Sequence, residues 1–96
     1  MPDYQDLFDQ VDAAYDEILA LEQALVRIPS VNTGVMPTGN ETPVAEYARD
    51  WLAQDGIASE ILESAPGRGN LISGLEGSSG KAGLLFMSHL DVVPVE

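Results

Sequence analysis

The sequence predicts an α/β fold in which two helices are followed by three strands of one sheet. Apolar residues in the first half recur at steps of three and four residues, the spacing of one helix face. The second half contains three short apolar stretches separated by turn-forming segments. The last stretch is apolar on both faces, which is typical of a central strand covered by helices on each side.

The first helix is predicted from residue 4 to residue 28, about seven turns. Its apolar positions share one face, and we expect this face to pack in the core. These positions are Tyr4, Leu7, Phe8, Val11, Ala14, Tyr15, Ile18, Leu21, Leu25 and Ile28. Asp3 and Asp6 near its start suit the helix dipole, and Pro29 ends the pattern.

Residues 29–42 are predicted to form a loop, because they contain two prolines, two glycines and two asparagines. Thr42 then has the chemistry of an N-cap, with Pro43 at the first helical position. The second helix is expected over residues 43–55 and ends at Gly56. Its Trp51 is interpreted as a core anchor rather than a ligand-stacking residue.

Three strands are predicted at residues 57–63, 70–75 and 82–88. The links 64–68 and 76–81 are too short to hold a crossover helix, so neighbouring strands should be antiparallel if they pair directly. The chain shows no internal repeat and no second domain, and residues 1–96 are treated as one unit.

Composition and charge exclude several classes of protein. A hydrophobic content of 45% argues against disorder, and the absence of cysteine excludes thiolate metal sites. Sixteen acidic residues against four basic ones give a net charge of −12, so nucleic acids and membrane surfaces are poor partners. The N-terminus has no signal-peptide pattern and no apolar run is long enough to span a bilayer, which predicts a cytoplasmic protein.

The candidate site is the pair His89 and Asp91, and His89 is the only histidine of the chain. In an extended segment residues two apart point to the same face, so the carboxylate can accept the imidazole N–H and leave the other ring nitrogen free for a metal. The pair follows a predicted buried strand, where ligands collect on open α/β sheets, and Pro94 then turns the chain away.

Two other chemistries are discounted. Ser88 is adjacent to His89 and faces the opposite way in extended chain, so the two cannot act as nucleophile and base. The glycines between residues 67 and 83 form no phosphate loop, because no Gly-Lys-Ser/Thr follows and no helix begins there.

Several motifs carry a family resemblance. Residues 84–94, LLFMSHLDVVP, resemble the first metal-ligand motif of the M20 family of metallopeptidases and amidohydrolases. That family includes aminoacylases, acetylornithine deacetylase, succinyl-diaminopimelate desuccinylase and glutamate carboxypeptidases. Residues 25–32, LVRIPSVN, are similar to the family's helix-to-loop signature, Gly39–Thr42 to its second element, and Gly69–Ile72 to its second strand.

The resemblance implies that residues 1–96 are part of a three-layer α/β/α zinc-hydrolase catalytic domain with a mixed sheet, truncated after the first metal-ligand motif. In such a domain His89 would be a metal ligand, and Asp91 would be the catalytic residue that orients its imidazole. Two zinc ions, or cobalt or manganese as substitutes, would activate a water for attack on an amide. The substrate would be a small peptide or an N-acyl amino acid, and the complete protein could be a homodimer.

The residues leave two readings open. In the first, the chain is the N-terminal portion of an M20-type hydrolase and is inactive by itself, because the other ligands and the general base lie downstream in the family. In the second, it is a small acidic α/β binding module in which His89 and Asp91 form a structural pair.

Overall fold

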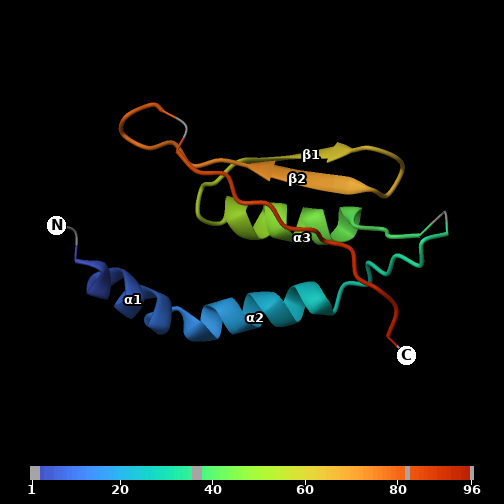
Figure 1. Cartoon of the computed structure of the whole chain (residues 1–96), viewed down its shortest axis with the longest axis horizontal. Helices are drawn as coiled ribbons and strands as arrows, with labels where there is room; N and C mark the ends of the chain where they lie inside the picture. Colours follow the sequence, from blue (N-terminus) through green and yellow to red (C-terminus); the bar gives the residue numbers. More distant parts are fainter. Residues whose placement is uncertain (1–2, 36–37, 82, 96) are drawn as a thin grey trace.

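The computed structural model describes residues 3–35, 38–81 and 83–95. Within them the chain forms three helices followed by two antiparallel strands, which confirms the predicted α/β class. Helices α1 (Tyr4–Ala13) and α2 (Tyr15–Val26) form one layer, as Figure 1 shows. Helix α3 (Thr42–Ala53) lies between them and the hairpin of β1 (Ser59–Glu63) and β2 (Gly69–Ser73).

The single helix predicted over residues 4–28 is instead two helices. The regular pattern of helical backbone hydrogen bonds is interrupted at Ala14 (φ −89°, ψ 5°), whose N–H is shared between the carbonyls of Gln10 and Val11. Such a shared bond is typical of a locally tightened turn. Asp6 lies in the first turn, where an acid suits the helix dipole as predicted, and Asp3 is the N-cap, whose carboxylate accepts the N–H of Gln5 at 2.9 Å.

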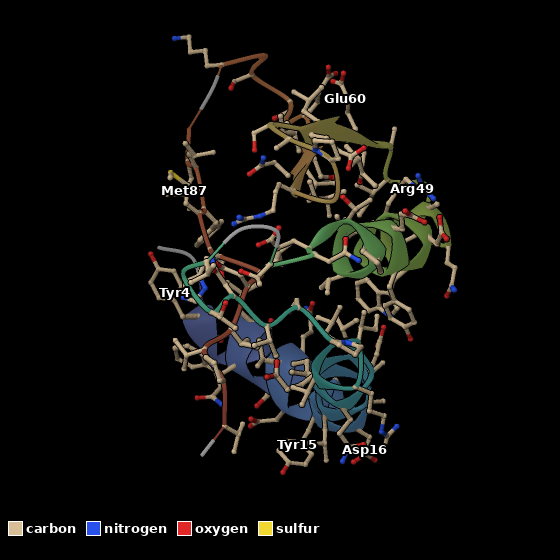
Figure 2. All side chains as sticks on the ribbon, turned by 90° about the vertical axis from the view of Figure 1, so that its right-hand side faces the viewer. Tyr4, Tyr15, Asp16, Arg49, Glu60 and Met87 are labelled. Carbon is tan, nitrogen blue, oxygen red and sulfur yellow. The ribbon has the colours of Figure 1, made fainter. Side chains whose placement is uncertain are left out.

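The predicted core face of this helix pair is largely open. Tyr4, Phe8 and Tyr15 are 59–65% exposed, and Figure 2 shows Tyr15 projecting away from α3 and the hairpin. The prediction that this whole stripe packs in a core is therefore wrong for the described chain.

Helix α3 carries the small core. Among the described residues the buried apolar side chains are Val44 and Ala45. Gly56 takes φ +74° just beyond the end, as predicted, while Pro43 is the second helical residue rather than the first. The N-cap prediction is off by one residue: Glu41 occupies that position, while the Thr42 hydroxyl donates to Glu63 Oε2 at 2.9 Å.

The predicted antiparallel hairpin is confirmed. Strand β1 pairs with β2 from Ser59–Ser73 to Glu63–Gly69, and the link of residues 64–68 forms the turn. Both strands pack on α3, so the hairpin and the helix stabilise one another.

The third predicted strand, at residues 82–88, is wrong for its described part, and residue 82 lies outside the described residues. Residues 83–88 form no strand, and the side chains of Leu84, Leu85, Phe86 and Met87 are 79–87% exposed. Figure 2 shows Met87 on the outer side of this segment. A groove of about 610 Å³ separates residues 85–88 from β2, so the segment lacks the hydrogen-bonded neighbour that a strand requires.

The dimensions show how open the chain is. Its accessible surface is 8043 Å², where a compact protein of 10.2 kDa has roughly 5,300 Å². Its radius of gyration is 16.1 Å, against about 12 Å for a compact domain of this length. Residues 1–96 therefore have the shape of a partial α/β domain. None of the helices in the described ranges is both long and apolar enough to cross a bilayer.

Candidate functional site

The segment that carries His89 and Asp91 is held by a parallel contact with the start of the first loop. The N–H of Val92 donates to the carbonyl of Ser30 at 3.0 Å, and the N–H of Asn32 donates to the carbonyl of Val92 at 2.8 Å. The Ser30 hydroxyl, on a buried residue, adds a bond of 2.8 Å to the carbonyl of Leu90. These bonds fix the backbone on both sides of Asp91.

His89 and Asp91 are neighbours, as the two-residue spacing predicts. Nδ1 of the imidazole lies 2.8 Å from the backbone oxygen of Asp91 and 3.3 Å from its carboxylate oxygen Oδ1. The nearer acceptor is therefore the carbonyl rather than the carboxylate. With the proton on Nδ1, Nε2 carries the lone pair, and the side chain is 84% exposed.

The other carboxylate oxygen of Asp91, Oδ2, accepts a hydrogen bond of 2.9 Å from Nδ2 of Asn32. Nη2 of Arg68 lies 3.8 Å from the same oxygen. The Asn32 hydrogen bond is the main reason that the pKa of Asp91 is lowered below its ordinary value, and the nearby charges of His89 and Arg68 act in the same direction. Asp91 is thus held as an anion.

The buried carboxylate of Glu41 holds Arg68 beside Asp91. Glu41, only 6% exposed, accepts a hydrogen bond of 2.6 Å from Nε of Arg68 to its Oε2. Glu41 precedes α3 and Arg68 precedes β2, so the pair joins the helix to the hairpin beside the site. A buried carboxylate is stable only when it is paired, and Arg68 supplies that pairing.

These groups surround a cavity of about 400 Å³. Its polar lining comes mainly from the loop before α3, the hairpin and the C-terminal segment, and includes Glu41, Ser64, Arg68, Asn70, His89 and Asp91.

The sequence predicts that His89 and Asp91 lie together, which the structure shows, while their roles at a metal site stay a prediction; it assigns no role to Asn32, Glu41 or Arg68. Asn32 and Glu41 belong to the motifs that carry the family resemblance, and Arg68 is one of the four basic residues of the chain. An acidic residue directly before a helix carries an electrostatic benefit, and this was the available signal for Glu41.

The described residues do not by themselves build a zinc site. Nowhere in residues 3–35, 38–81 and 83–95 do three or more His, Cys, Asp or Glu side chains gather as a metal would require. Catalytic zinc normally takes three protein ligands, while here Asp91 is engaged by Asn32 and Glu41 by Arg68. One imidazole is available.

Comparison with known proteins points to one class of hydrolases, the deacetylases. The chain is 43% identical over 58 residues to acetylornithine deacetylase of Vibrio cholerae serotype O1, and 34% identical over 58 residues to acetylornithine deacetylase of Vibrio atlanticus. Each aligned stretch covers 60% of this chain and 15% of the relative. No protein-family profile and no solved structure matches the chain.

Proposed function

We propose that residues 1–96 are the N-terminal portion of the catalytic domain of an M20-type amidohydrolase that removes acyl groups from N-acyl amino acids. The observation that carries this proposal is the 43% identity to acetylornithine deacetylase. The His89–Asp91 pair at the edge of a cavity, with its anion held in place, supports it.

In this proposal Nε2 of His89 supplies one ligand of a zinc site whose other ligands lie outside these residues. Bound zinc supplies Lewis-acid polarisation of an amide carbonyl and lowers the pKa of a water. The backbone oxygen of Asp91 accepts a hydrogen bond from Nδ1–H, and the Asp91 carboxylate lies beside the ring, which keeps the imidazole oriented. Residues 1–96 alone are expected to be inactive.

The direct test uses the complete protein with N-acetylornithine as the probe substrate, and follows release of acetate together with metal content. We expect His89→Ala to abolish turnover and to weaken one metal site. Asp91→Asn should retain the fold and most of the metal and lower turnover about 10–100-fold. Full activity of His89→Ala with unchanged metal content would refute the proposal.

The second candidate is an acidic binding module, and the exposed apolar residues Leu84–Met87 favour it because they could receive a partner. The coding sequence beyond residue 96 distinguishes the two. An in-frame glycine-rich segment with an aspartate, followed by a Glu-Glu pair, supports the hydrolase. A stop codon with no downstream remnant supports the module.

A further inference from the structure

We infer that Asn32 is a positioning residue: it holds the carboxylate of Asp91 beside the imidazole of His89, where the charge of this carboxylate adds to the bond from Nδ1–H to the Asp91 carbonyl in favouring the Nδ1–H tautomer. The importance of that tautomer rests on the proposed function, because only a ring protonated on Nδ1 offers Nε2 to a metal. The contacts themselves do not depend on it.

The two oxygens of Asp91 have separate partners. Oδ2 accepts from Asn32 Nδ2 at 2.9 Å and faces Arg68 Nη2 at 3.8 Å, while Oδ1 lies 3.3 Å from His89 Nδ1. A carboxylate held at one oxygen by a directional donor cannot rotate freely, so the position of its other oxygen is fixed as well.

The amide of Asn32 is itself fixed. Its Oδ1 accepts the backbone N–H of Gly34 at 2.8 Å. Because a backbone N–H can only donate, this bond settles which end of the amide is oxygen and directs Nδ2 toward Asp91. The backbone of Asn32 is held in turn by its bond of 2.8 Å to Val92.

The Glu41–Arg68 pair strengthens the same geometry. Glu41 is buried and holds Nε of Arg68 at 2.6 Å, so the guanidinium stays on the Oδ2 side of Asp91. A cation on this side favours keeping the negative charge there, with Oδ1 turned to the imidazole. The contacts of Asn32 and Arg68 converge on one oxygen.

The chain offers an unusually clean readout, because His89 is its only histidine and its ring nitrogens give unique ¹⁵N signals. We would record the ¹⁵N spectrum of the 96-residue chain at a pH where the ring is neutral, without metal or substrate. The unmutated chain should show mainly the Nδ1–H tautomer. It should also show a nuclear Overhauser contact between the Asn32 side-chain amide and the β protons of Asp91.

Asn32→Asp separates positioning from local structure. The aspartate keeps an oxygen for the N–H of Gly34 but loses the donor to Asp91, which frees the carboxylate to turn away from the ring. The ratio of Nδ1–H to Nε2–H should fall about two- to fivefold, the worth of an exposed charge contact, because the bond to the Asp91 carbonyl remains. Asn70→Asp is the matched control, since Asn70 lines the cavity together with His89 and Asp91, and its amide donates to Leu62 rather than to Asp91. The ratio should not change in that control.

The exchanged pair Asn32→Asp with Asp91→Asn tests the contact directly. It restores a donor–acceptor pair with reversed polarity, so a nuclear Overhauser contact should return, now between the side-chain amide of residue 91 and the β protons of residue 32. An unchanged ratio in Asn32→Asp, or an equal fall in Asn70→Asp, would overturn the inference.

Absence of the Overhauser contact in the unmutated chain would overturn it equally, and needs no variant to fold. These outcomes differ from failure of the proposed function, which is read from acetate release by the complete protein. An inactive complete protein with the expected tautomer ratios would sink the deacetylase proposal and leave the positioning role intact.

Discussion

Gly39 lies where the loop passes behind the candidate site, and replacing it with alanine should disturb the site and the fold together. Gly39 is buried and has φ +78°. A Cβ at this position would lie 2.8 Å from Oε1 of Glu41 and 3.1 Å from Cζ of Arg68. Neither atom can move away cheaply, because the Glu41 carboxylate is buried and held by Arg68 at 2.6 Å.

The same loop supplies a matched control. Gly34 has φ +81°, yet a Cβ there would meet nothing within 4 Å. Both alanine variants therefore incur the cost of a left-handed backbone, roughly 1–2 kcal/mol. Gly39→Ala adds the cost of overpacking, about 1–3 kcal/mol. We expect it to be less stable than Gly34→Ala by about that second amount.

The assay is thermal and urea unfolding followed by far-ultraviolet circular dichroism. For a chain of this size the difference corresponds to about 5–20 °C between the two variants. An osmolyte such as trimethylamine oxide brings the less stable variant into a measurable range if necessary. Equal stability of Gly34→Ala and Gly39→Ala would show that the Glu41–Arg68 pair is not packed against the loop as described.

Three further predictions follow from the site and the surface. The pKa of Asp91 is lowered in the folded chain, so the ionised carboxylate stabilises the fold above its ordinary pKa, and this contribution is lost as the pH falls through the folded value. In Asn32→Ala a carboxylate ¹³C titration should show the pKa of Asp91 rising toward its ordinary value. No rise would contradict the role of the Asn32 hydrogen bond. Calorimetric titration of the 96-residue chain should detect weak zinc binding at most, because one imidazole is available; a stoichiometric submicromolar site that disappears in His89→Ala would instead indicate metal shared across an oligomer. Phe86→Glu should reduce self-association of the chain, measured by sedimentation velocity, without changing its helix content, since the exposed apolar residues 84–87 can pair with another chain. Unchanged self-association would show that these residues do not form the contact between chains.

Elements governed by local chemistry were predictable from the sequence. Pro43 and Gly56 mark the two ends of α3, and the short link 64–68 between two apolar stretches can only return the chain as a hairpin. The break at Ala14 was not predictable in this way. No proline or glycine marks it, and the apolar spacing continues through it.

The segment at residues 83–88 shows the limit of reading burial from apolar composition. The run of apolar residues indicates that this segment is stable as a strand only when other residues cover it and pair with it, but it does not indicate which residues these are. In the described chain β2 does not come close enough to pair, so the segment stays extended and exposed. Composition indicates the need for partners, while only the three-dimensional arrangement supplies them.

In the candidate site, likewise, contacts between residues close in sequence were predictable and contacts between distant residues were not. The proximity of His89 and Asp91 follows from a two-residue spacing and was predictable. Asn32 lies 59 residues from Asp91, and Glu41 lies 27 residues from Arg68, and no local pattern connects residues so far apart. Their roles depend on how α3 and the hairpin bring the loop to the C-terminal segment.

The parallel contact between residues 30–32 and 90–92 has a consequence for the order of folding. Closing a loop of 60 residues costs about 4 kcal/mol of chain entropy, so this contact cannot form early by itself. The hairpin and α3 are close in sequence and can form first, which shortens the effective loop. During synthesis His89 leaves the ribosome long after Asn32, so the contact between residues 30–32 and 90–92 can form only after both segments have been made. The geometry of the candidate site is therefore among the last features of this chain to be acquired.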